Sequence, residues 1–204
     1  MTRPSITGIP AAVSAVVACL ALLAGCSSAQ HESAPKRSAA TQKLLAQADL
    51  QPCPSAGKPA SGGKLLPDLS IGCLGGDRSV SLRSLTGTPT VLNFWASWCD
   101  NCVAEMSTLQ RFATAAAGKV RVLGVNSQDL SEQAPLNVLT AAKVHFPSVF
   151  DKEGKVSHAM GLPGLPVTVL VRADGSVAQQ HLGPVSFDQL RALTQQHLHV
   201  AIRG

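Results

Sequence analysis

The sequence predicts an α/β fold in which a mixed sheet is flanked by helices, and three features indicate it. A continuous β-prone run at residues 90–96 precedes a helical pattern and a second apolar run at 120–125, so strand, helix and strand form a βαβ unit with parallel strands. Two further strand-like runs, at 167–171 and 177–182, enclose a turn at 172–175, as in a closing hairpin. Hydrophobic residues make up 45% of the 204 residues and charged residues 14%, which excludes a disordered chain.

Each expected element follows from its local pattern. Residues 69–73 and 79–82 flank turn residues and predict an N-terminal β-hairpin extension. The run at 90–96 has no polar alternation, as expected of a central strand that is covered on both faces. Apolar residues at helical spacing form one face of a helix predicted from about residue 99 to 117: Val103, Met106, Leu109 and Phe112. Further helices are expected over 131–143 and 187–198.

The charge pattern argues against nucleic-acid binding. The chain has 17 Lys and Arg against 12 Asp and Glu, a formal charge of +5, but the basic residues are scattered. Aromatic residues are only 3%, without any tyrosine, so few rings are present to stack on bases. The six histidines are dispersed, and no metal site is predicted from them.

The N-terminus has the features of an export signal. Residues 9–25 form an apolar stretch behind Arg3, shorter than the about 20 residues of a spanning helix, so residues 1–25 are interpreted as a signal peptide. Residues 23–26, L-A-G-C, resemble the bacterial lipobox, in which the cysteine is diacylated and becomes the first mature residue. Two acyl chains hold a protein firmly to a bilayer. We therefore expect Cys26 to anchor the protein to the outer face of the cell membrane; a plain signal peptide or an uncleaved anchor is the alternative.

The segment after Cys26 has the composition of a linker. Residues 26–62 are rich in Ser, Ala, Gln, Pro and Gly and are predicted to form a flexible stalk, with at most one short helix near 39–48. Residues 63–204 are then the folded domain, whose length suits a single core.

Four cysteines remain for the mature domain, because Cys19 lies in the signal and Cys26 is the lipid attachment point. Cys99 and Cys102 form a C-x-x-C motif, so Cys53 and Cys73 are expected to pair with each other. Such a bridge would stabilise the fold by about 3 kcal/mol in the chain-entropy model. A second redox pair is the functional alternative. A zinc site from all four cysteines is disfavoured, because the earlier two are too far apart to form a zinc knuckle.

The C-x-x-C motif follows a buried strand and begins a helix. The first turn of a helix has unpaired N–H groups and a partial positive charge, which favour the nucleophilic thiolate at Cys99. Cys102 lies three residues on, close enough to form a disulfide with Cys99 or to attack a mixed disulfide that it holds. Trp98 would shield the nucleophile and offer an apolar surface to a partner, whereas Trp95 is expected in the core. The alternatives are an inert structural disulfide or half of a metal site.

The motif W-A-S-W-C-x-x-C after V-L-N-F, together with G-L-P-V-T before the closing strands, resembles thioredoxin-fold proteins. Within these, residues 65–200 are similar to the membrane-tethered TlpA/ResA group of extracytoplasmic thiol-disulfide oxidoreductases. The resemblance implies a thioredoxin-like fold, a nucleophile at Cys99, a resolving thiol at Cys102 and no cofactor. It also implies a cis peptide between Leu165 and Pro166, where extended partner segments would bind the backbone.

One acidic residue, Asp100, lies inside the motif, and another, Glu105, follows it. The resemblance implies that Glu105, at C-x-x-C-x-x-E, lies near the thiols and handles their protons, with a surface helix glutamate as the alternative. Asn93 stands where ordinary thioredoxins carry a buried aspartate. Asp100 and Asn101 separate the cysteines, and an anion beside Cys99 disfavours its thiolate, which favours a reductant. Capping of the helix by Asp100 would weaken that effect.

The expected function is therefore the reduction of protein disulfides outside the cytoplasm. By resemblance, apocytochrome c cysteines are the expected substrate and a membrane thiol-disulfide carrier is the electron donor. Three alternatives stay open. These are an oxidant that forms disulfides in exported proteins, a Cu(I) metallochaperone that binds through both thiolates, and a lipoprotein whose C-x-x-C is only structural.

Overall fold

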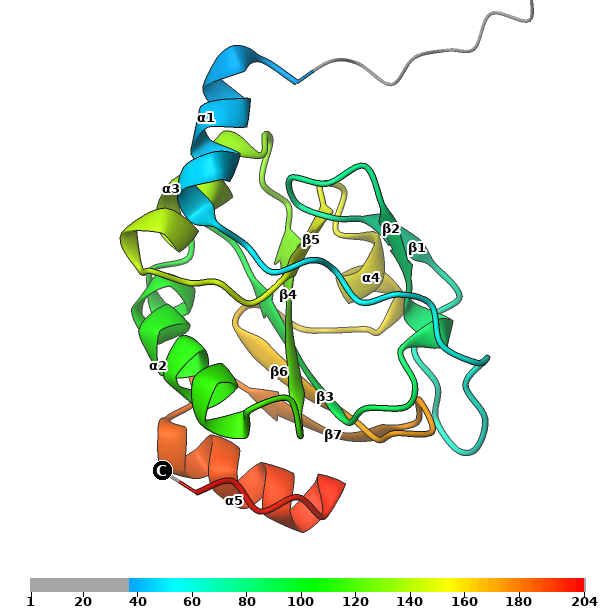
Figure 1. Cartoon of the computed structure of the whole chain (residues 1–204). Helices are drawn as coiled ribbons and strands as arrows, with labels where there is room; N and C mark the ends of the chain where they lie inside the picture. The colour runs from blue at the N-terminus through cyan, green and yellow to red at the C-terminus, as the bar shows by residue number, and fades with distance from the viewer. Residues whose placement is uncertain (1–36, 204) are drawn as a thin grey trace, which may run out of the picture. The chain divides into compact units, whose positions relative to one another are not determined.

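The computed structural model describes residues 37–203 and contains a five-stranded mixed sheet in the order β5-β4-β3-β6-β7 (Figure 1). The strands are β3 (Thr90–Trp95), β4 (Arg121–Ser127), β5 (Ser148–Asp151), β6 (Val167–Val171) and β7 (Val177–Leu182). Strands β3, β4 and β5 are parallel, whereas β6 is antiparallel to β3 and β7 to β6. This is the predicted thioredoxin-like fold, and β3 is buried along its whole length, as expected of the central strand.

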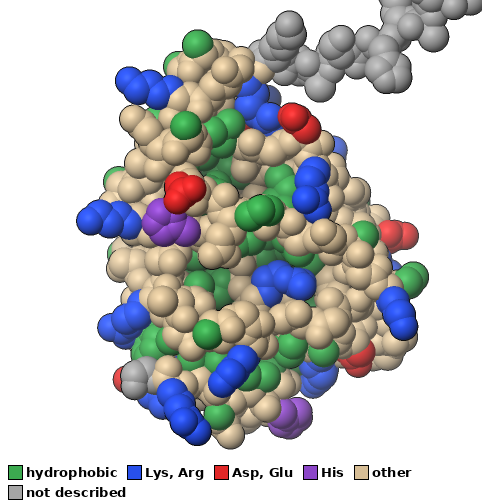
Figure 2. Space-filling view, in the orientation of Figure 1, with side chains coloured by type: hydrophobic (Ala, Val, Ile, Leu, Met, Phe, Trp, Pro, Cys, Tyr) green, Lys and Arg blue, Asp and Glu red, His purple; other side chains and the backbone are tan. Residues whose placement is uncertain are grey.

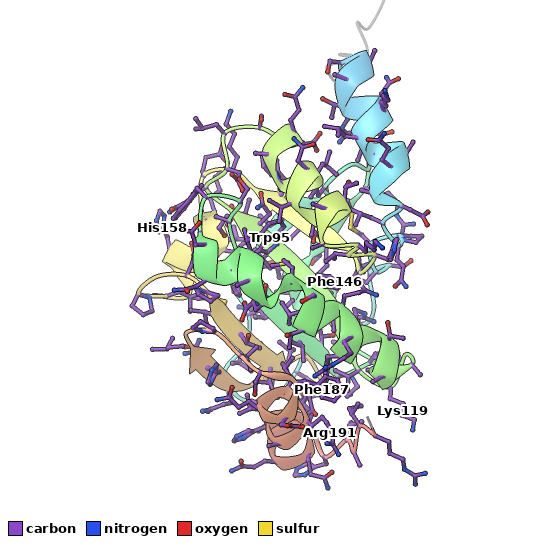
Figure 3. The ribbon with its side chains drawn as sticks, turned by 90° about the vertical axis from the view of Figure 1, so that its left-hand side faces the viewer. Trp95, Lys119, Phe146, His158, Phe187 and Arg191 are labelled. Carbon is purple, nitrogen blue, oxygen red and sulfur yellow. A yellow bond between two sulfur atoms is a disulfide. The ribbon has the colours of Figure 1, made fainter. Side chains whose placement is uncertain are left out.

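Helices cover one face of the sheet (Figure 1). They are α1 (Ala39–Ala48), α2 (Asp100–Ala116), α3 (Gln133–Ala141) and α5 (Phe187–Leu198), and their apolar side chains form one core with the sheet. Helix α5 packs against α2 through an edge-to-face contact of Phe187 with Phe112, at 6.3 Å between ring centroids (Figure 3). The predicted face of α2 is correct, because Met106, Leu109 and Phe112 are fully buried.

The opposite face carries the predicted N-terminal hairpin. Its strands are β1 (Ser70–Gly72) and β2 (Ser79–Ser81), followed by the short helix η1 (Leu82–Ser84). Together with α4 (Lys155–Ala159) these elements enclose a second core around the other side of the sheet. The sequence analysis did not anticipate β5 or α4, because four and five residues are too few for a periodic pattern.

Residues 37–62 belong to the domain, which corrects the predicted boundary at residue 62. Helix α1 lies against α3, and Arg37 Nε is 2.7 Å from Glu132 Oε2. The chain then crosses the domain as a strap, residues 49–62. The strap donates backbone hydrogen bonds to the domain, from Gln51 N–H to the His145 carbonyl and from Ala60 N–H to the Arg83 carbonyl. The polar composition conceals three leucines that pack on the core: Leu44, Leu45 and Leu50. The predicted signal peptide and the lipid attachment point Cys26 lie outside the described residues.

The outer surface has no segregated charge on the face seen in Figure 2. Lysine and arginine side chains are dispersed over it between uncharged regions. In residues 37–203, no helix is long and apolar enough to cross a membrane.

Candidate active site

Cys99 lies in the loop between β3 and α2 and is the N-cap residue of that helix. Its backbone is extended, with φ −97° and ψ 101°, and its sulfur accepts a hydrogen bond from the Cys102 N–H at 3.3 Å. The two cysteines are joined in a disulfide; Cys99 is half-buried and Cys102 is fully buried behind it. Asp100 is the first helical residue and not the cap, so an exposed acidic side chain follows Cys99 directly in the chain.

Trp98, which precedes Cys99, and the loop before β6 line a hollow. Trp98 is 59% exposed, and its indole N–H donates to the Gln128 carbonyl at 3.3 Å. Together with Leu165 and His158 it lines a hollow of about 240 Å³. The Leu165–Pro166 peptide is cis, as the resemblance implied, and Pro166 lines an adjoining hollow that also includes Leu165. The structure therefore brings Trp98, the neighbour of Cys99 in the chain, to the same hollow as Leu165, while Trp95 is buried in the core as predicted.

Glu105 is a buried carboxylate, not a surface residue of the helix. It is only 4% exposed and lies on α2, one turn beyond Cys102. Its oxygens accept hydrogen bonds from Asn93 Nδ2 at 2.8 Å and from the Val185 N–H at 2.9 Å. Burial raises the pKa of Glu105 above its ordinary value, although the Val185 and Asn93 hydrogen bonds and nearby His181 act in the opposite direction.

The Asn93 side-chain amide offers both a donor and an acceptor toward Glu105. Its Nδ2 donates to the ionised carboxylate, whereas its Oδ1 is buried without a hydrogen-bond partner among the described residues. Rotation of the amide by half a turn would present Oδ1 as an acceptor for protonated Glu105. The asparagine thus replaces the buried aspartate of ordinary thioredoxins with a neutral partner for the acid on α2.

A second buried acid, Asp129, holds the loop before the disulfide and was missed by the sequence analysis. It is 4% exposed and accepts the Ser97 N–H at 2.9 Å and Asn126 Nδ2 at 2.7 Å. The Ser97 hydroxyl also donates to it. The sequence signal for Asp129 was the polar run that follows the apolar part of β4. Because β3 and β4 are parallel and end at the same edge of the sheet, residues after β4 lie close to the loop after β3.

Cys53 and Cys73 are joined, as predicted from the cysteine count, with their Cα atoms 6.2 Å apart. They fasten the strap to the end of β1, beside Val149 of β5. The hollow that they line, of about 250 Å³, shares no residue with the hollow at Trp98. Because both pairs are disulfides, a zinc site built from all four cysteines is excluded in this state. Among residues 37–203, no group of three or more His, Cys, Asp or Glu is arranged to hold a metal ion.

Comparison with known proteins agrees with this geometry. A family model described as Redoxin matches residues 60–194. The chain belongs to the Redoxin family. It is 30% identical to the thiol-disulfide oxidoreductase ResA of Bacillus thuringiensis, over 63% of this chain and 73% of that protein. It is also 30% identical to the thiol:disulfide interchange protein DsbE of Vibrio cholerae, over 61% of this chain and 66% of that protein.

Solved structures show the same similarity. StoA of Bacillus subtilis matches with a TM-score of 0.53 and 27% identity, over 67% of this chain and 99% of StoA. The predicted fold and the predicted enzyme class, a thiol-disulfide oxidoreductase of the DsbE and ResA type, are confirmed by these relatives.

Proposed function

We propose that this protein reduces disulfides in exported proteins while it is anchored to the outer face of the cytoplasmic membrane through Cys26. The main support is the placement of one half-buried sulfur, Cys99, at the start of α2 with a fully buried partner, Cys102, behind it. A substrate can reach the sulfur of Cys99 but not that of Cys102. The sulfur of Cys102 can reach only the sulfur of Cys99. That asymmetry defines a nucleophile and a resolving thiol.

In the proposed reaction the reduced protein starts with two thiols. The Cys99 thiolate attacks one sulfur of a substrate disulfide, and a mixed disulfide forms as the other substrate sulfur leaves as a thiolate and takes up a proton. Cys102 then loses its proton and attacks the Cys99 sulfur, which releases the second substrate thiol and forms the disulfide present in the structure. Two electrons and two protons pass to the substrate, and a membrane thiol-disulfide carrier restores the dithiol.

Glu105 would accept the proton of Cys102 in the second step. Cys102 is buried, so water does not reach its thiol freely, and Glu105 is the buried acid one helical turn away. Because burial raises the pKa of Glu105 toward neutrality, the group is better matched to proton transfer than an exposed glutamate.

The electrostatics around Cys99 support the reducing direction. The start of the helix and the Cys102 N–H favour a thiolate, but Asp100 at the first helical position places a negative charge beside it. Strong oxidants of this fold stabilise their reduced form, and an acid at this position opposes that stabilisation.

The reduction potential tests this direction. Equilibration with glutathione buffers should give a value near that of thioredoxin, about −270 mV, whereas a value near that of DsbA, about −120 mV, would overturn the proposal. The variant Cys99→Ser serves as the control that cannot form the pair. Apocytochrome c is the proposed substrate, by resemblance to the TlpA/ResA group. Cys102→Ser should capture it as a mixed disulfide, and captured proteins that all lack a haem-attachment motif would refute that assignment.

The proposed anchor has its own test. Cys26→Ala should abolish incorporation of radiolabelled palmitate, because it removes the proposed acylation site. It should also lower the fraction of the protein that sediments with membranes, because the acyl chains that hold it there are absent. Equal labelling of the variant and the unaltered protein would contradict lipidation at Cys26 and would leave the redox proposal untouched.

A further inference from the structure

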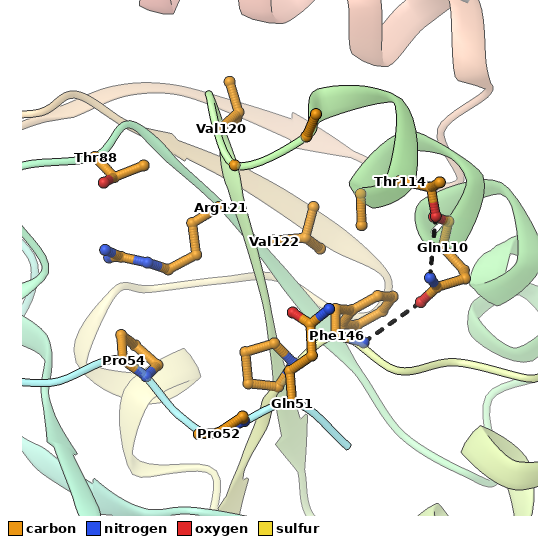
Figure 4. A pocket seen from close by; sticks show the side chains of 14 residues that line it. Gln51, Pro52, Pro54, Thr88, Gln110, Thr114, Val120, Arg121, Val122 and Phe146 are labelled. Atoms are coloured by element: carbon orange, nitrogen blue, oxygen red, sulfur yellow. Dashed lines mark hydrogen bonds between the residues drawn. The ribbon is translucent and has the colours of Figure 1, made fainter. Parts of the chain in front are cut away.

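A large cleft lies at the end of the sheet opposite the Cys99–Cys102 disulfide. It has a volume of about 660 Å³ and is bounded by the C-terminal half of α2, the start of β4 and the strap (Figure 4). Arg121, the first residue of β4, pairs with Thr90 at the start of β3, whereas the disulfide follows the end of β3. The length of β3, about 17 Å, therefore separates the cleft from the redox site.

Arg121 supplies an unpaired positive charge to this cleft. Its side chain lies between Thr88 and Pro54, as Figure 4 shows, and is half-buried. Its one hydrogen bond goes from Nη1 to Thr90 Oγ1 at 3.3 Å, and no carboxylate of residues 37–203 lies within 4.0 Å of it. Arg37, by contrast, pairs with both Glu132 and Asp77.

Burial of this charge has an energetic consequence. Desolvation lowers the pKa of Arg121, and no nearby acid offsets it. A guanidinium that is partly removed from water without an anion is destabilised until one binds. The planar guanidinium presents paired N–H donors that match the two oxygens of a carboxylate.

Apart from Arg121 the lining is uncharged and combines apolar side chains with threonine and glutamine side chains. Pro52 and Pro54 of the strap face Val122 and Phe146 across the cleft (Figure 4). Gln51 also lines it, and its side chain makes no hydrogen bond within the described residues. Gln110 is different in this respect: its Oε1 accepts the His145 N–H at 2.8 Å and its Nε2 donates to Thr114, so it forms a fixed wall.

The strap wall is held in place before any ligand arrives. Cys53, between the two prolines, is bonded to Cys73, and the Gln51 N–H donates to the His145 carbonyl at 2.7 Å. A cleft that is already formed loses little conformational entropy on binding. Its volume lies within the range of about 300–1,000 Å³ that is typical of ligand pockets.

We propose that this cleft is a binding site for a carboxylate carried on an apolar body. The guanidinium of Arg121 binds the carboxylate, the Gln51 amide donates to it, and the prolines, Val122 and Phe146 cover the apolar part. A small organic acid and the C-terminal residue of a protein both offer this chemistry. The site is separate from the redox site, because its lining includes neither Cys99 nor Cys102.

Titration calorimetry on the full-length protein tests the proposal with three probes: hexanoate, an N-acetyl dipeptide that ends in leucine with a free carboxylate, and the C-terminal amide of that dipeptide. We expect a free acid to bind at least about tenfold more tightly than the amide. Tighter binding of the dipeptide acid than of hexanoate identifies a protein C-terminus as the ligand, and the reverse order identifies a small organic acid.

Two variants locate the site. Arg121→Gln should weaken binding of the acid by about tenfold or more, and Arg121→Lys should weaken it less, because the charge remains but the paired donors are lost. Lys119→Gln is the matched control: Lys119 lies in the turn after α2 (Figure 3) and does not line the cleft, so removing the same charge there should leave binding unchanged. Absence of binding by either acid at about 10 mM, equal binding of the amide, or equal losses in the Lys119 and Arg121 variants would overturn the proposal.

Discussion

Replacing both Cys53 and Cys73 by serine should destabilise the protein without affecting its redox activity. The disulfide closes a loop with a sequence separation of 20 residues, for which the chain-entropy relation gives about 3 kcal/mol. For a domain of this size that loss lowers the melting temperature by about 6–12 °C. Backbone hydrogen bonds of the strap, such as that from the Gln51 N–H, remain, so the variant should still fold.

Urea denaturation of the oxidised proteins, followed by circular dichroism, measures the loss. The slope of unfolding free energy against urea should rise in the variant, because its unfolded chain is no longer cross-linked and exposes more surface. Insulin reduction should stay at the unaltered rate. The control, Cys99→Ser with Cys102→Ser, removes a disulfide across only 3 residues, so it should lose less stability but all insulin reduction. A loss below about 1 kcal/mol together with slower insulin reduction would show that Cys53 and Cys73 transfer electrons and do not act as a structural link.

Three further substitutions test the active site. In urea titrations, Glu105→Gln should become more stable relative to the unaltered protein as pH rises. The pKa of Glu105 is raised in the folded state, so the stability that the protonated acid contributes is complete below the ordinary pKa of glutamate. That stability is lost as pH rises through the folded pKa. A pH-independent difference would contradict this. Asp129→Ala leaves the Ser97 N–H and Asn126 without their acceptor and should cost about 2–4 kcal/mol by urea denaturation, against less than about 0.5 kcal/mol for exposed Asp188→Ala; equal losses would refute the role of Asp129. Trp98→Ala should change stability by under about 0.5 kcal/mol but should raise the KM for insulin, because the indole is 59% exposed beside the disulfide; an unchanged KM would exclude it from substrate contact.

The sequence predicted the long elements correctly because each depends on local patterns. The apolar run of β3 and the helical spacing of α2 follow from residues close in the chain, and both are placed within about two residues of their predicted ends. The C-x-x-C at their junction indicated the candidate nucleophile for the same reason. The pairing of Cys53 with Cys73 followed from the cysteine count alone.

Other features depended on contacts between residues that are distant in the chain. Leucines in a polar segment gave no sign that residues 37–62 pack on the domain, because the surface that they cover is formed by α3 and the sheet. Asp129 reaches Ser97 only because two parallel strands end at one edge.

The sequence by itself determined the class of fold and indicated the candidate nucleophile and its partner thiol, because strand and helix periodicity and cysteine spacing are local properties. Only the tertiary structure decided that Glu105 is buried between Asn93 and Val185 and that Arg121 faces a cleft without a carboxylate. Burial and the absence of a counter-ion are properties of a whole neighbourhood, assembled from segments far apart in the chain, so no local pattern encodes them.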